Sequence, residues 1–183
     1  MKHTHSILHG LSLTAGLLGL GLLSGGIACA QQSGRVSPHE TTSAVLGGKK
    51  IAIEYGRPYK KGREIFGKLE PFGKVWRTGA DEATTIETAG DLMLGSLHVP
   101  AGKYSLFTIP GETEWTLIIN KVPKQSGAYD YDAKNDLGRI KMKLEKSPKV
   151  TEQLTISLDG QGSRGTLKIA WDNVIASVPV MMH

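Results

Sequence analysis

The stretch QLTISLDGQGSRGTLKIAWDN, residues 153–173, alternates apolar and polar side chains on both sides of a glycine-rich turn. A period of two residues is typical of a β-strand with one buried face and one solvated face. The sequence DGQGSRG between the two halves is typical of a turn. The stretch therefore predicts two strands whose inward residues are Leu154, Ile156, Leu158, Leu167, Ile169 and Trp171.

The same period recurs along the chain from about residue 41 to the C-terminus. Further predicted strands are KIAIEYG (50–56), TTIET (84–88), DLMLG (91–95), KYSLFTI (103–109), EWTLIINK (114–121) and RIKMKLEK (139–146). No segment has a helical period, and YDAKNDLGR (131–139) predicts only a turn. The pattern predicts a single all-β domain over residues 41–183, a jelly-roll-like antiparallel β-sandwich of about eight to ten strands.

Composition limits the classes of protein that the chain can belong to. Its 183 residues suit one domain, and 39% apolar with 21% charged residues exclude a disordered or wholly membrane-embedded chain. The formal net charge is +5, but the basic residues are interspersed with acidic ones and form no aromatic-basic platform. We therefore predict no nucleic-acid partner.

The N-terminus is typical of an export signal. Lys2 precedes an uncharged, leucine-rich core at residues 11–27, and the small residues 28–30 fit a cleavage site before Gln31. A membrane-spanning helix needs about 20 predominantly apolar residues, and this core is shorter and rich in glycine. We predict a signal peptide at residues 1–30 and a flexible tether at residues 31–40, which are polar and contain Gly and Pro.

The lone cysteine, Cys29, lies in the predicted cleavage region. GIAC (26–29) is an imperfect lipoprotein signal, so Cys29 either becomes the lipidated first residue or leaves with the signal peptide. A membrane is then expected as a partner only through a lipid anchor at Cys29. In both cases the mature protein has no pair of cysteines for a disulfide.

The least periodic part of the chain runs from Arg57 to Thr84 and holds the most varied chemistry. Arginine recognises carboxylate or phosphate through two parallel hydrogen bonds, and tryptophan stacks on sugars. We predict a ligand site for an anion or sugar acid with candidate residues Tyr55, Arg57, Arg63, Trp76, Arg77, Asp81 and Glu82. The alternatives are that Trp76 caps the core and that an arginine pairs internally with a carboxylate, with Arg77 as the expected anchor of the segment.

Catalytic and metal sites have weaker signals in this sequence. Asp81 and Glu82 could form an acid/base pair, but adjacent strand residues point to opposite faces unless the backbone turns there. The D-x-D at Asp130 and Asp132 supplies too few ligands for calcium, and no histidine spacing fits zinc. No G-x-S-x-G elbow is present. We predict no metal, no cofactor and no catalytic residue.

Four motifs together resemble one bacterial family, the domain of unknown function 2911. They are EYGRPYKKGREIFGKLEPFGKVWRTGADEATTIE (54–87), VPAGKYSLFTIPGETEWTLIINK (99–121), GAYDYDAKND (127–136) and AWDN (170–173). The resemblance covers about residues 37–180 and implies an exported β-sandwich module of Gram-negative bacteria without an established activity. Relatives tend to carry Asn at the position of Asp81 and Trp at that of Ser126, which bears on specificity if either touches a ligand.

The expected protein is thus an exported, non-catalytic module, periplasmic or anchored to the outer membrane as a lipoprotein. It is expected to bind a small polar or anionic ligand, a glycan or an envelope partner through the Arg57–Thr84 segment. The first alternative is a carbohydrate- or ester-acting hydrolase that uses Asp81, Glu82 or Asp132. The second is a purely structural envelope domain whose long loop only supports the sheet.

Overall fold

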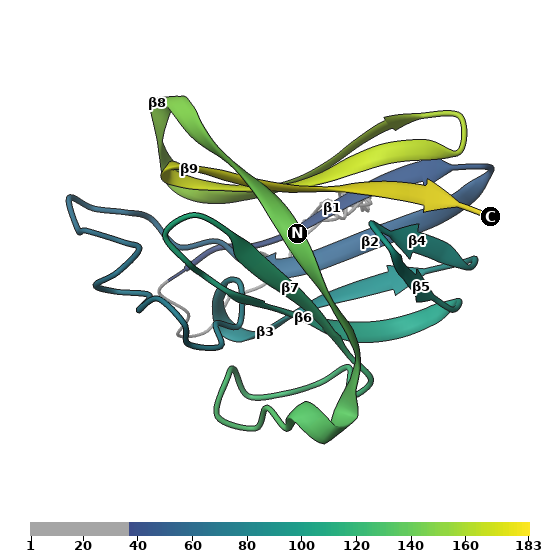
Figure 1. The fold of residues 1–183 in the computed structure, drawn as a ribbon, viewed down its shortest axis with the longest axis horizontal. Coiled ribbons are helices and arrows are strands. Elements are labelled where there is room, and N and C mark those ends of the chain that lie inside the picture. Colours follow the sequence, from purple (N-terminus) through teal and green to yellow (C-terminus); the bar gives the residue numbers. More distant parts are fainter. Residues whose placement is uncertain (1–36) are drawn as a thin grey trace, which may run out of the picture. The chain divides into compact units, whose positions relative to one another are not determined.

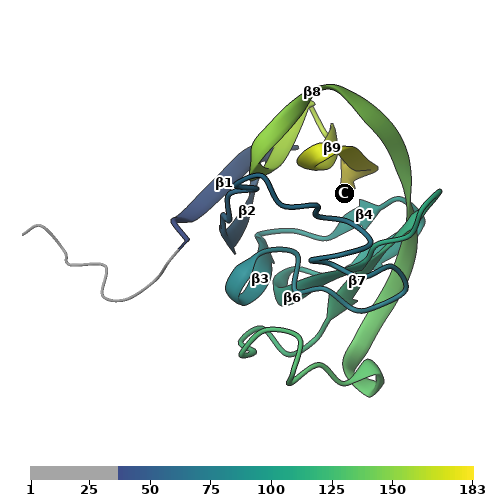
Figure 2. The ribbon, with the colours of Figure 1, turned by 90° about the vertical axis from the view of Figure 1, so that its left-hand side faces the viewer.

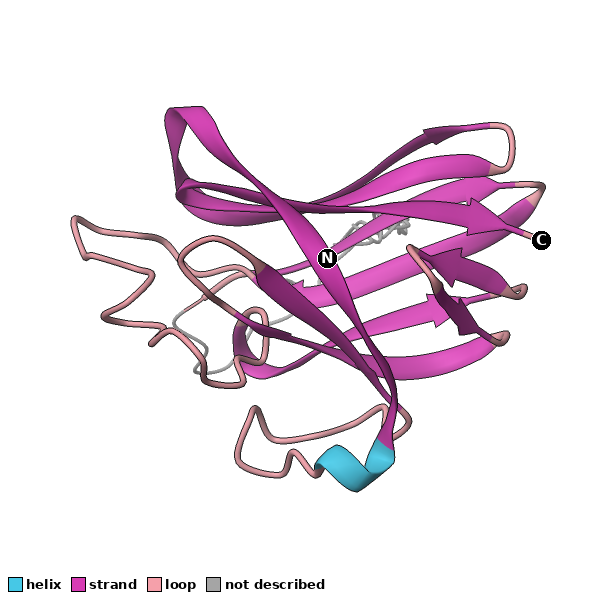
Figure 3. Cartoon of the chain, in the orientation of Figure 1, coloured by secondary structure: helices cyan, strands magenta, loops and turns pink. Residues whose placement is uncertain are grey.

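The computed structural model describes residues 37–183, and the predicted signal peptide and Cys29 lie outside this part of the chain. The strands are β1 (His39–Leu46), β2 (Lys49–Gly56), β3 (Ala80–Thr88), β4 (Leu92–Leu94), β5 (Leu97–Val99), β6 (Gly102–Ile109), β7 (Trp115–Asn120), β8 (Asp136–Gln161) and β9 (Arg164–Met182). The one helical element among these residues is a short 3-10 helix, η1 (Ala133–Asn135), within the segment predicted as a turn (Figure 3). Since β1 begins at His39, the last two residues of the predicted tether belong to a strand.

All strand pairs in the described residues are antiparallel, and their order is β1-β2-β3-β6-β7-β8-β9-β4-β5. The prediction of an all-β antiparallel fold with eight to ten strands is confirmed. The predicted strands TTIET and DLMLG do not pair with each other. The first belongs to β3, whereas the second forms β4, which pairs with β5 and with the end of β9.

The long strand β8 folds the sheet into two layers. Its first part, up to Met142, pairs with β7, and its later part, from Lys143, pairs with β9. The pairing with β9 is irregular between Lys146 and Thr155, in a stretch that contains Pro148. Figures 1 and 2 show the later part of β8 and β9 lying over the layer of β2, β3, β6 and β7.

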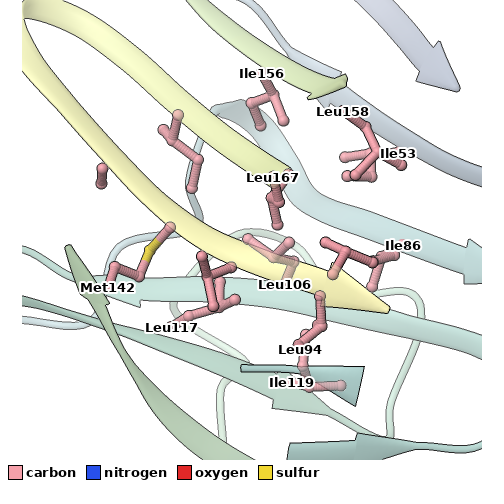
Figure 4. Packing of buried hydrophobic residues seen from close by; sticks show 14 of the residues in the cluster. Ile53, Ile86, Leu94, Leu106, Leu117, Ile119, Met142, Ile156, Leu158 and Leu167 are labelled. Atoms are coloured by element: carbon pink, nitrogen blue, oxygen red, sulfur yellow. The ribbon is translucent and has the colours of Figure 1, made fainter. Parts of the chain in front are cut away.

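The core lies between these layers and comes from the positions that the period of two predicts. Leu154, Ile156, Leu158, Leu167, Ile169 and Trp171 are all buried, as are Ile51, Ile53, Tyr55, Trp115, Leu117 and Ile119. Figure 4 shows side chains from both layers meeting, with Ile156 and Leu167 above and Leu106 and Leu117 below. Strand β6, which pairs with β3 and β7, is buried on both faces from Ser105 to Thr108.

The segment between β2 and β3, residues 57–79, extends from one end of the sheet (dark blue to teal in Figure 1) and folds back on it. Trp76 and Thr108 of β6 exchange backbone hydrogen bonds of 2.7 and 2.9 Å. At the start of the segment, Leu154 N donates to Pro58 O (2.9 Å). Ile65 is fully buried, so this β2–β3 segment contributes to the core as well as to the surface.

None of the described helices is both long enough and apolar enough to cross a membrane.

Candidate functional site

The structure divides the seven predicted site residues among different surroundings. Arg63, Arg77 and Asp81 line one cavity of about 260 Å³, here called the arginine cavity. Tyr55 and Glu82 line a second cavity of about 380 Å³, here called the sheet-face cavity because β2, β3 and β6 contribute to its wall. Arg57 and Trp76 line neither of these two cavities.

Arg57 ties the end of β2 to two other strands. Its Nε donates to Leu154 O (2.8 Å), its Nη2 to Thr155 Oγ1 (2.9 Å), and its Nη1 to Glu40 Oε2 (2.6 Å). Each of the three guanidinium nitrogens of Arg57 therefore already donates a hydrogen bond within the protein. An arginine–carboxylate anchor was predicted for this part of the chain, but the structure places it at Arg57 with Glu40 as partner.

Arg77, for which that anchor was predicted, makes no ion pair with a carboxylate of residues 37–183, so this prediction is wrong. Its Nε donates to Gly79 O (3.1 Å), the one hydrogen bond of its side chain to the described residues. The side chain is half-buried, and a guanidinium has five N–H donors. A half-buried cation with most of its donors uncommitted therefore lines the arginine cavity.

These contacts predict that two arginine variants differ in how much stability they lose. Arg57→Ala is expected to lower the free energy of unfolding by about 1–2 kcal/mol, because three hydrogen bonds between strands are lost. Arg77→Ala is expected to lose less, about 0.5–1 kcal/mol, because it removes a single hydrogen bond, to Gly79 O, and breaks no ion pair among the described residues. Urea unfolding of the three proteins checks this, and a larger loss for Arg77→Ala than for Arg57→Ala would contradict it.

Arg63 lines the arginine cavity from an exposed turn. Its Nε donates to Lys60 O (2.9 Å), and its Nη2 donates to Tyr59 O. Lys60 itself reaches Asp172 Oδ2 of β9 (3.0 Å), so the turn is fastened to the opposite layer. The guanidinium of Arg63 is thus held in place by carbonyl oxygens, which leave its positive charge uncompensated.

Glu70 lies in the same cavity, and its carboxyl group forms neither a hydrogen bond nor an ion pair with residues 37–183. Burial raises the pKa of Glu70 to about 7, and the positive charges of Arg77 and Arg63 offset only part of this effect. A half-buried carboxyl with a strongly raised pKa beside two arginines is the kind of group found at functional sites.

Trp76 and Tyr55 are parts of the core. Trp76 is 4% exposed and stacks on Trp171, with ring centroids 5.9 Å apart and an interplanar angle of 18°. The Tyr55 hydroxyl accepts a hydrogen bond from Ile156 N (3.0 Å), and burial raises the pKa of Tyr55. Of the two interpretations of Trp76 from sequence, the structure shows a side chain packed in the core.

Asp81 and Glu82 converge on one histidine from different sides. His39 Nε2 lies 3.1 Å from Asp81 Oδ2 and 3.6 Å from Glu82 Oε2. This is possible because the backbone at Asp81 has a φ of 65°, a left-handed conformation that breaks the strand geometry. The two carboxylates nevertheless line different cavities, so they do not flank one shared substrate space.

The residues of the arginine cavity that were missed from sequence include Lys61, Glu70 and Trp171. Lys61 and Glu70 have the appearance of ordinary surface charges in KKGREIFGKLE, and nothing in their spacing signals a site. Trp171 was correctly assigned to the core, but its place beside the cavity depends on the packing of β9 against the β2–β3 segment. Its Nε1 is buried and has no hydrogen-bond partner among the described residues.

No group of three or more His, Cys, Asp or Glu side chains in residues 37–183 is arranged to hold a metal ion. The D-x-D aspartates serve local structure instead. Asp130 Oδ2 accepts from Ser126 N (2.9 Å), and Asp132 Oδ1 accepts from Lys134 N (3.0 Å) at the start of η1.

No curated protein and no solved structure matches this chain. A family model matches residues 37–180, which include both cavities and all nine strands except the last residues of β9. The motifs that carry the resemblance in the sequence lie within this range. The chain belongs to the family described as protein of unknown function DUF2911.

Proposed function

We propose that this domain binds a small anionic ligand, a carboxylate such as a sugar acid, in the arginine cavity. The observation that carries the proposal is Arg77, half-buried in the cavity wall without a carboxylate partner in the described residues. Arg63 and Lys61 add two further positive charges to the same wall. Guanidinium groups bind carboxylates through two parallel hydrogen bonds, which supplies both affinity and orientation.

The dimensions of the cavity favour a small ligand. Sites for drug-sized molecules have volumes of about 300–1,000 Å³, and the arginine cavity is smaller, at about 260 Å³. Tyr59 and Leu69, which are 39% and 41% exposed, also line it and offer apolar surface next to the cations. A single sugar ring or short carbon chain that bears a carboxylate fits these features.

The two alternative functions account for less of this geometry. A hydrolase that uses Asp81 with Glu82 would need both carboxylates on one substrate, and they line separate cavities. A purely structural role explains the contacts of Arg57 but gives no reason for the uncommitted donors of Arg77 or the half-buried carboxyl of Glu70. Binding is therefore the function that we propose.

The place of this binding is proposed to be the cell envelope. Support comes from the sequence alone, from the signal-like residues 1–30 and the polar residues that follow them. Lipidation at Cys29 would hold the domain at a membrane surface, and cleavage after Ala30 would release it as a periplasmic protein.

Calorimetric titration with galacturonate tests the binding proposal. Galactose serves as the neutral control ligand, because it lacks the carboxylate. We expect galacturonate to bind and galactose not to bind. Arg77→Ala is expected to weaken galacturonate binding about tenfold or more, since it removes a charge-assisted hydrogen-bond donor.

Arg164→Ala provides the matched control variant. Arg164 is exposed, lies at the start of β9 and lines neither cavity, so the variant makes the same change in net charge elsewhere. Equal weakening by Arg77→Ala and Arg164→Ala would show a general charge effect and refute the site. Absence of galacturonate binding, with citrate and phosphate also inert, would refute anion binding itself.

A further inference from the structure

Glu70 occupies a cavity that we assign to an anion, although its own ionised form would repel one. The other titratable side chains that line the cavity are Tyr59, Lys61, Arg63, Arg77 and Asp81. Of these, Arg77 and Arg63 act electrostatically on Glu70. Asp81 is already engaged, because its Oδ2 lies 3.1 Å from His39 Nε2. Glu70 has no such hydrogen-bonding or ion-pairing partner in residues 37–183, so it is the carboxyl group that must respond when a second negative charge arrives.

Resting on the proposed function, we propose that the anion enters the arginine cavity together with one proton, which the Glu70 carboxyl group holds. In the bound state the two arginines face the carboxylate of the ligand, and neutral Glu70 can donate a hydrogen bond instead of repelling it. Glu70 is thereby a binding residue whose protonation couples binding of the ligand to binding of a proton. Attraction of the ligand by the arginines alone would involve no proton.

The direction of the coupling follows from the electrostatics of the cavity. Burial already raises the pKa of Glu70 to about 7 in the ligand-free protein, despite Arg77 and Arg63. A bound carboxylate adds a like charge next to Glu70, and it partly neutralises the positive charges of the arginines. Both effects disfavour the ionised form of Glu70 and raise its pKa further. Since linkage is reciprocal, raising the proton affinity of Glu70 means that protonation raises the affinity for the ligand.

The pH range of the effect is set by Glu70. Below pH 7 the free protein already holds the proton, so the affinity changes little with pH. Above pH 7 the proton must be taken up on binding, so the affinity is expected to fall by roughly tenfold for each pH unit until the pKa of the complex is reached. Galacturonate is the suitable probe because a sugar acid stays ionised throughout, whereas phosphate itself titrates within this pH range.

Calorimetry with galacturonate at pH 6 and pH 8, in buffers of different ionisation enthalpy, measures affinity and proton uptake together. We expect binding to be up to about tenfold weaker at pH 8 than at pH 6, with close to one proton taken up per ligand bound at pH 8. Glu70→Gln is expected to bind with the same affinity at both pH values and to take up no proton, since an amide keeps the shape but does not titrate.

Two control variants test the other groups that could hold the proton. Asp81→Asn and His39→Gln are expected to keep the pH dependence and the proton uptake of the wild type. Loss of the uptake in either of them, and not in Glu70→Gln, would overturn the assignment to Glu70. Wild-type binding that is equally tight at both pH values, with no proton taken up, would overturn this inference but leave the binding function standing. Absence of binding at pH 6 would overturn both.

Discussion

Trp171→Ala is expected to lower the free energy of unfolding by about 3–5 kcal/mol, the range for removal of a buried tryptophan. Trp171 is 1% exposed and lies where β9 meets the β2–β3 segment. Its ring stacks on Trp76 and meets the edge of Phe66, with centroids 6.2 Å apart. Alanine would remove these aromatic contacts and leave a cavity between β9 and the β2–β3 segment. Urea unfolding followed by far-UV circular dichroism measures the loss.

Trp171→Phe separates the ring packing from the indole N–H. The buried Nε1 of Trp171 has no hydrogen-bond partner in the described part of the chain, and an unpartnered buried donor destabilises the folded state. Phenylalanine removes this donor while it keeps an aromatic ring against Trp76. We expect Trp171→Phe to lose less than half of what Trp171→Ala loses. A urea midpoint for Trp171→Ala equal to that of the wild type would contradict the assignment of this side chain to the core.

The core positions could be predicted from sequence because they depend on a local rule. In a strand with one buried face, alternate side chains face the same side, so a polar residue between Leu154 and Ile156 fixes which face is inward. In β7 the rule is incomplete, because Ile118 is fully buried as well as Leu117 and Ile119. The strand count followed from these repeats and the turns between them.

The pairing of distant strands could not be predicted in the same way. Leu94 of β4 pairs with Val180 of β9, and nothing in the period of either segment names its partner. The change of partner within β8, from β7 to β9, similarly depends on how the whole sheet closes over its core. Which distant strands pair depends on how the whole chain packs. A local hydrophobic pattern identifies a strand but not its partner.

The candidate site was predicted as a region but not as a set of residues. Arg57 and Arg77 look alike in sequence. In the structure Arg57 donates hydrogen bonds to Leu154 O, Thr155 and Glu40, whereas Arg77 lines a cavity. Glu70 was missed because its raised pKa arises from burial, which is set by the fold of the segment around it. Residue type predicts what chemistry is possible, and packing decides which side chains remain free to perform it.

Gly56→Ala is expected to lower the free energy of unfolding by about 3 kcal/mol or more, at the upper end of the range for overpacking. A Cβ at Gly56 would lie 2.1 Å from Ala80 O and 2.8 Å from the Ala80 carbonyl carbon. These are backbone atoms of the strand with which Gly56 pairs, so no side chain can turn aside to make room. The register of β2 against β3 also shifts between Glu54 and Gly56, so the pairing is irregular at this glycine.

Gly48→Ala is the matched control for this substitution. Gly48 lies in the β1–β2 turn with a φ of 75°, and a Cβ there would meet no atom within 4 Å. Its variant therefore suffers only the backbone strain of a non-glycine residue, about 1–2 kcal/mol. The difference between the two variants isolates the clash at Gly56. If both lost the same stability in urea unfolding, the close approach of β2 and β3 would be refuted.

The binding site is expected to change in Gly56→Ala as well. A Cβ at Gly79 would lie 2.9 Å from Gly56 O, so a displaced Gly56 moves the backbone that carries Arg77 and Asp81. Gly56→Ala is accordingly expected to weaken galacturonate binding in the fraction that remains folded, whereas Gly48→Ala is expected to bind as the wild type does.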